Sequence, residues 1–113
     1  MKNLTPHAII VRTVMNGDQI FQPSGEVARV AASTEVISIT HLGTDIIRTV
    51  YGEVEGLGVP SDYPEGVLVS SLVLSRLNSE WAGIAFAPAT GPKDGAIRDE
   101  KGHIVAVTKL VTV

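Results

Sequence analysis

The sequence predicts a mainly β fold, mostly antiparallel, built as a β-sandwich or a partly closed barrel with one short α-helix near residues 71–80. Runs rich in Val, Ile and Thr recur through the first half, and each ends in a turn-forming stretch. The spacing of apolar residues changes from the period of a strand to that of a helix only after Ser71. At 113 residues the chain has the size of one domain, so we expect a single β-rich domain over residues 1–113.

The first predicted strands form a hairpin. Residues 4–14 are rich in apolar and β-branched side chains, Pro6 confines the start of this strand to an edge or a bulge, and residues 19–21 supply the return strand. Asn16 and Gly17 between them both tolerate positive φ, which predicts a two-residue type I′ turn. A Pro-Ser-Gly stretch at residues 23–25 predicts a further turn before the next apolar run.

A second hairpin follows in the middle of the chain. Residues 35–41 alternate between two faces, residues 42–45 turn the chain, and residues 45–54 return. Gly52 stands inside the return strand, where it predicts a β-bulge or a close approach of another backbone segment.

The only predicted helix lies after a loop and a short buried strand. Residues 56–66 contain several Gly and Pro and form the loop, and residues 67–70 form the strand. Apolar residues then recur at helical spacing between polar ones, and Ser70 or Ser71 is placed to cap the helix N-terminus. These patterns predict one amphipathic helix over about residues 71–80.

The last part of the chain predicts a strand, a loop and a terminal hairpin. Residues 83–87 form the strand, and residues 96–100 and 103–113 flank the turn at Lys101 and Gly102. Residues 90–95 have the composition of a phosphate-binding loop, but their order is wrong and no helix follows them. A surface Ω-loop is therefore the favoured interpretation of that stretch.

The composition of the chain excludes several kinds of site and argues against several kinds of partner. The chain has no cysteine, so disulfides and thiolate metal sites are excluded. No apolar run approaches the length of a bilayer span, and the first residues lack the pattern of a signal peptide, so we expect a cytoplasmic protein without a membrane partner. The formal net charge of −3 without a basic stripe argues against binding to duplex nucleic acid.

Arginines carry the main ligand hypothesis. Arg29 and Arg48 each stand within an apolar strand, where an inward-pointing guanidinium requires an anion such as a phosphate or carboxylate. The alternatives are an exposed strand face or an internal pair with Glu53. Arg98 is a third candidate for the same charge. Tyr51 and Trp81 are the aromatics that can stack on a planar ligand, although the helix-end position of Trp81 is also typical of a core residue.

Histidines and carboxylates carry weaker hypotheses. His7, His41 and His103 show no metal-binding spacing, and we predict no metal and no cofactor. An enzyme that uses Glu53 or His7 as an acid or base is a further alternative, and it requires a pocket that perturbs their pKa values. Because no catalytic motif is present, the sequence favours a protein without enzymatic activity.

Four strings of the sequence resemble a group of small proteins encoded by bacteriophages, prophages and some actinobacteria. They are NLTPH at residues 3–7, SGEVARV at residues 24–30, YGEVEGL at residues 51–57 and RDEKGHIV at residues 98–105. The chain departs from the group after Glu53 and Glu55, because it has Leu57-Gly58-Val59-Pro60 where Gly-Leu-Pro is expected directly after the glutamates, and its loop before Val67 is longer. The resemblance implies a small phage accessory protein made in the host bacterial cytoplasm.

Together these observations favour a protein that acts by binding. The leading hypothesis is sequestration of a small anionic, nucleotide-like signal of host defence by Arg29, Arg48 and Arg98, with Tyr51 or Trp81 stacking on it. A host protein is an alternative partner, and a structural or assembly component of a phage particle is an alternative function. We also expect a homo-oligomer, most simply a dimer, because residues 67–92 carry few charges and predict an exposed apolar patch.

Overall fold

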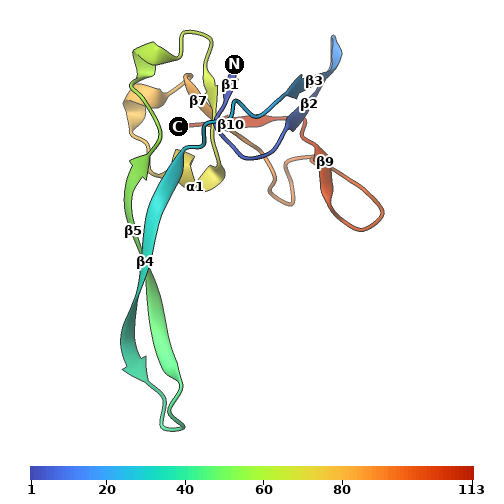
Figure 1. Ribbon diagram of the computed structural model, residues 1–113. Helices are drawn as coiled ribbons and strands as arrows, with labels where there is room; N and C mark the ends of the chain where they lie inside the picture. The colour runs from blue at the N-terminus through green and yellow to red at the C-terminus, as the bar shows by residue number, and fades with distance from the viewer.

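The computed structural model describes residues 1–113 as a small body from which one long hairpin projects (Figure 1). Ten strands and a single five-residue α-helix confirm the mainly β, mostly antiparallel fold with one short helix. The projection makes the molecule elongated, with extents of 58 × 39 × 25 Å. Its radius of gyration is 17.0 Å, whereas a compact domain of this length has about 13 Å.

The body is organised around a four-stranded sheet. The strands stand in the order β1 (Lys2–Asn3), β6 (Val67–Leu68), β7 (Ala85–Pro88) and β10 (Leu110–Thr112). β6 runs parallel to both β1 and β7, and β10 runs antiparallel to β7. The order is open at both edges, so this sheet does not close into a barrel.

The main core lies between this sheet and α1 (Ser71–Ser75). Val67, Val69, Val73 and Trp81 belong to one buried cluster. Residues 67–92 therefore supply much of the core, and the exposed apolar patch predicted for them is wrong. The apolar residues that are exposed lie mainly elsewhere, and many of them are on the projecting hairpin.

The helix starts where the sequence predicts and ends earlier. Ser70 caps it, since its side-chain oxygen accepts a hydrogen bond from the Val73 amide at 3.2 Å. The Arg76 and Leu77 amides then bond to carbonyls three residues back, at 3.0 and 3.1 Å, and this tightens the last turn. A separate 3₁₀ turn, η2 (Ser79–Trp81), begins after Asn78 and completes the predicted helical region.

The first hairpin pairs β2 (Ile9–Thr13) with β3 (Gly17–Phe21). The two-residue type I′ turn predicted at Asn16 and Gly17 is wrong. Thr13 pairs with Gly17, so the loop has three residues, and only Gly17 has positive φ (69°). The Thr13 hydroxyl donates to the Gly17 carbonyl at 2.6 Å and accepts from the Asn16 amide at 3.0 Å, which stabilises the longer loop.

A buried asparagine interrupts the predicted first strand. Asn3 is 1% exposed, and its amide nitrogen donates to the carbonyls of His7 and Phe21, both at 2.9 Å. Its side-chain oxygen accepts from the Thr5 amide at 2.9 Å and the Thr5 hydroxyl at 2.7 Å. These bonds hold residues 5–7 in a turn, so β1 ends at Asn3 and β2 begins only at Ile9.

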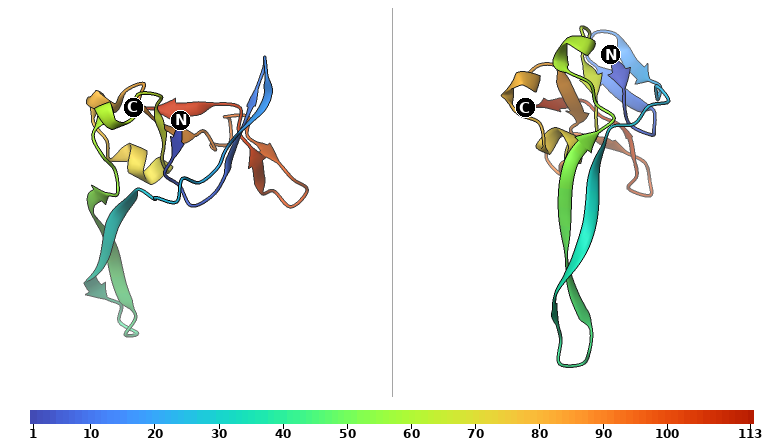
Figure 2. Two further views of the ribbon diagram at one scale, coloured as in Figure 1. Left: turned by 45° about the horizontal axis from the view of Figure 1, so that its top comes forward. Right: turned by 60° about the vertical axis from the view of Figure 1, so that its left-hand side comes forward.

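The projecting hairpin, here called the arm, consists of β4 (Arg29–Ile39) and β5 (Asp45–Glu55). Both views of Figure 2 show the arm leaving the body and twisting along its length. The bulge predicted at Gly52 is confirmed. Val30 pairs with Val54 and Ala32 with Tyr51, so Ala31 alone stands opposite Gly52 and Glu53.

The remaining elements are short. A 3₁₀ turn, η1 (Pro60–Asp62), lies in the predicted loop after the arm, and the hairpin of β8 (Ile97–Arg98) and β9 (Ile104–Ala106) follows the loop of residues 90–95. The final predicted strand is divided between β9 and β10, because Val107 exchanges backbone hydrogen bonds with β2 and the chain bends at Thr108. No helix is long and apolar enough to cross a bilayer.

Candidate functional site

An open groove lies where the arm leaves the body. Its volume is about 320 Å³. The lining residues are Pro6, Val27, Ala28, Arg29, Val30, Ser70 and Leu72. They come from the turn after β1, the entry to β4 and the start of α1, so the groove exists only because three distant segments converge.

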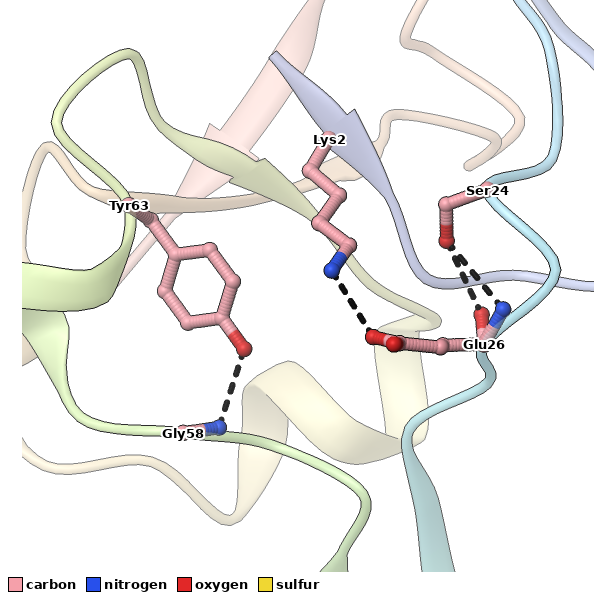
Figure 3. Close-up of polar contacts among 5 residues, drawn as sticks. All are labelled: Lys2, Ser24, Glu26, Gly58 and Tyr63. Atoms are coloured by element: carbon pink, nitrogen blue, oxygen red, sulfur yellow. Dashed lines mark hydrogen bonds and ion pairs between the residues drawn. The ribbon is translucent and has the colours of Figure 1, made fainter.

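Hydrogen bonds to the first residues of the chain hold the entry to β4. The Ser24 amide donates to the Asn3 carbonyl and the Ala28 amide to the Leu4 carbonyl, both at 3.0 Å. Lys2 Nζ lies 2.7 Å from Glu26 Oε2 (Figure 3), and this hydrogen bond raises the pKa of Lys2. The segment that carries Arg29 is therefore attached to β1 and to the residue that follows it.

A second set of contacts holds the chain where it returns from β5. The Gly58 amide donates to the Tyr63 hydroxyl at 2.9 Å (Figure 3). Gly56 has φ of 79°, and a Cβ atom there would lie 2.5 Å from the Val27 carbonyl oxygen. Only glycine allows this approach, which brings the two ends of the arm together beside the groove.

The chemistry of the groove suits a small anion with an apolar part. Arg29 is exposed and takes part in no ion pair, although Glu55 stands opposite it in the strand ladder. The Ser70 oxygen accepts from the Val73 amide, so its hydroxyl hydrogen remains available as a donor. Aliphatic side chains, including Val27 and Leu72, line the groove beside these polar groups.

Arg48 differs from Arg29 in having a partner. Its Nη2 lies 2.8 Å and its Nε 2.9 Å from Glu35 Oε1 in the middle of the arm, and its side chain is 63% exposed. The internal pair considered with Glu53 is wrong, because Glu35 stands directly across the ladder from Arg48. Neither Arg29 nor Arg48 is buried, so neither needs an anion to offset the desolvation of its charge.

The two candidate aromatics have different surroundings. The Tyr51 side chain is half-exposed on the arm, and the Arg76 guanidinium carbon lies 5.1 Å from the centre of its ring. Trp81 is 5% exposed and packs in the core, with its ring centre 6.0 Å from that of Tyr63. The ring of Trp81 therefore has no free face on which a ligand can stack.

The remaining candidates lie apart from the groove. The Arg98 guanidinium donates to the Gly102 carbonyl at 2.9 Å within the β8–β9 hairpin. His103 Nδ1 lies 3.7 Å from Asp99 Oδ2 in the same hairpin, whereas His41 lies in the turn at the tip of the arm.

No hydrogen bond or ion pair joins Glu53 to His7, and no three His, Asp or Glu residues cluster as metal ligands would.

The structure thus brings only Arg29 of the predicted residues into the groove. Sequence reasoning identified Ser70 as a helix cap but not as a lining residue of the groove, because the other walls of the groove come from distant segments. Comparison with known protein families, with curated proteins and with solved structures finds no match to this chain.

Proposed function

We propose that this protein acts by binding, and that it captures a small anionic, nucleotide-like ligand in the groove at the base of the arm. The observation that carries the proposal is Arg29, which lines an apolar-walled groove and has no carboxylate partner in the chain. Arg12 and Arg48 are already paired with carboxylates, and Arg98 bonds to a carbonyl.

Each part of the groove has a role in such binding. A guanidinium binds phosphate oxygens through two parallel hydrogen bonds, and the Ser70 hydroxyl supplies a further donor. The aliphatic walls pack against an apolar or planar part of the ligand. The volume of about 320 Å³ is at the small end of the range of ligand sites, which fits a nucleotide fragment better than a large cofactor.

The biological context of the proposal comes from the resemblance to small phage accessory proteins. A phage protein that sequesters a nucleotide signal protects the infection without catalysing a reaction. Such a protein acts in the bacterial cytoplasm, where the signal is made, and requires no cofactor.

The direct test is mass spectrometry of the small molecules that heating releases from protein purified from infected and uninfected bacteria. Calorimetry with a panel of nucleoside mono- and diphosphates then measures the affinity. We expect Arg29→Ala to abolish binding without changing the circular dichroism spectrum.

Arg12→Ala is the matched control, because it removes the same charge from the β2–β3 hairpin, and His41→Ala is a second control at the tip of the arm. Both variants should bind like the wild type. Equal loss of binding in Arg29→Ala and Arg12→Ala, or the absence of any released or bound phosphate compound, contradicts the proposal.

A structural or assembly role is the second candidate function, and the arm is the observation that favours it. An exposed two-stranded hairpin with apolar side chains is suited to packing against other subunits. Proteomic analysis of purified phage particles tests this role. Stoichiometric presence of the protein in the particles supports assembly, whereas its restriction to the cell extract supports sequestration.

A further inference from the structure

The two faces of the arm have different compositions. Paired residues of an antiparallel ladder share a face, and alternate residues of one strand do too. Over residues 30–36 and 47–54 one face, here called the uncharged face, thus carries the four pairs Val30–Val54, Ala32–Tyr51, Thr34–Thr49 and Val36–Ile47. A second bulge follows Val36, and beyond it the pair Ile39–Asp45 ends this side of the arm with a carboxylate at the tip. The opposite face carries the Ser33–Val50 and Glu35–Arg48 pairs, including the ion pair of the arm.

The uncharged face is a continuation of the core. Val30 and Val54 are partly buried and pack against the main core cluster. Farther out, the same face is open to solvent. Tyr51 is 43% exposed, and Val36 and Ile47 are both 56% exposed.

No other element of this chain covers the outer part of that face. Arg76 lies over the Tyr51 ring near the body, and both views of Figure 2 show the rest of the arm standing clear. An isolated two-stranded ribbon is at best marginally stable in water, and an added layer on an apolar face is what stabilises one. The sequence of the uncharged face is suited to such a layer.

The exposed area of the chain is also large for its mass. It amounts to 7559 Å², whereas a folded monomer of 11.9 kDa exposes about 5,900 Å². The excess of roughly 1,600 Å² is twice the area of about 800 Å² that each partner buries in a standard interface. One chain therefore has enough surplus surface for a stable dimer.

We infer that the uncharged face of the arm binds the uncharged face of a second copy of this chain. A face without charges over its four pairs offers nothing to select an acidic or basic partner. It is compatible with itself about a twofold axis, because each β-branched side chain meets another uncharged one. Two twisted ribbons packed in this way lie about 10 Å apart, as the layers of a β-sandwich do.

Two neighbouring isoleucines provide the matched test. Ile47 lies on the uncharged face, and Ile46, 42% exposed and paired with Ser38, lies on the opposite one. Sedimentation equilibrium should find the wild type dimeric at tens of micromolar. Ile47→Glu should raise the dissociation constant about a hundredfold, because each dimer would have to bury two carboxylates, and Ile46→Glu should leave it within a few-fold of wild type.

A labelling experiment tests the same surface without adding charge. Since the chain has no cysteine, single cysteines introduced by Thr49→Cys and Val50→Cys report on the two faces separately. Maleimide labelling at Thr49→Cys should slow several-fold when the protein is concentrated, and labelling at Val50→Cys should not.

A monomeric wild type at tens of micromolar overturns the inference. It is also overturned if Ile46→Glu dissociates the dimer as much as Ile47→Glu does, or if Val50→Cys is the protected site. The inference is independent of anion binding, because both isoleucines lie outside the groove that contains Arg29.

Discussion

The two longest hairpins of this protein differ in what covers them. In the β2–β3 hairpin, Ile9 and Val11 are buried against Leu68 and Val107. The backbone of β2 is also bonded to Val107, through the Arg12 amide at 2.8 Å and the Ile10 carbonyl at 2.9 Å. The arm has eleven residues in each strand, more than twice the length of β2 or β3, yet only its base packs on the body.

The difference shows that strand pairing and strand burial are separate properties. Both hairpins have antiparallel ladders and β-branched side chains. The short hairpin is part of the body because a segment about a hundred residues away in the sequence packs against it. The arm has no such segment, so its apolar side chains remain available to a partner.

The largest effect on stability is expected when one isoleucine of each hairpin is replaced by alanine and the two losses are compared. Ile9 is 9% exposed, so Ile9→Ala should lower the free energy of unfolding by about 2–5 kcal/mol. Ile46 is 42% exposed on the arm, and Ile46→Ala should lower it by less than about 1 kcal/mol. Urea unfolding of dilute protein measures both, and similar losses would mean that the arm is as well packed as the body.

A smaller effect on stability is expected from replacing two glycines, one at the base of the arm and one at its tip. Gly56 and Gly43 both have positive φ, of 79° and 87°, but only a Cβ at Gly56 would meet another residue, at 2.5 Å from the Val27 carbonyl oxygen. Gly56→Ala should therefore cost about 2–4 kcal/mol of stability, through strain and the forced separation of the arm's two ends.

At the tip of the arm, Gly43→Ala should cost about 1 kcal/mol, because it adds only the penalty of a left-handed conformation. Thermal unfolding of the two variants gives the comparison. A Gly56→Ala protein as stable as Gly43→Ala would show that the base of the arm is not held tightly.

The smallest effect concerns an ion pair on the short hairpin. Arg12 Nε lies 2.8 Å from Asp18 Oδ1, and this hydrogen bond lowers the pKa of the Asp18 carboxyl. A carboxyl with a lower pKa in the folded state stabilises the fold at pH values above its unfolded-state pKa. That contribution is lost as the pH falls through the folded-state pKa.

NMR titration of Asp18 measures this shift, and Arg12→Gln should raise the pKa toward that of an unpaired aspartate. Because the pair is exposed, the change in stability should be slight and confined to acid. An Asp18 pKa that does not respond to Arg12→Gln would show that the pair does not persist in solution.

Local patterns in the sequence were sufficient to predict the main secondary-structure elements. Runs rich in Val, Ile and Thr between turn-forming residues predicted both hairpins, Gly52 predicted the bulge of the arm, and Ser70 predicted the start of the helix. The Asn16–Gly17 turn was predicted in the right place with the wrong geometry. The Thr13 hydroxyl stabilises a longer loop there, a contribution that the dipeptide preference does not include.

The groove depended on contacts that the sequence does not encode locally. Arg29 was predicted as a ligand residue because an arginine in an apolar strand suggested burial, and the structure leaves it exposed. Its position beside Ser70 and Leu72 instead follows from the packing of α1 against the entry to β4. The buried Asn3 could not be predicted for the same reason, since it bonds to the carbonyls of His7 and Phe21, and the fold is what brings these two residues beside it.

Local sequence patterns were therefore enough to predict the two hairpins and the start of the single helix. Strands and helices depend on backbone preferences and on apolar residues that recur every two residues in a strand and every 3.6 in a helix. Residues close together in the sequence set both features. Which apolar faces are buried depends instead on tertiary packing. Covering a face requires a segment from elsewhere in the chain, which residues 104–107 provide for β2 and no segment provides for the outer part of the arm.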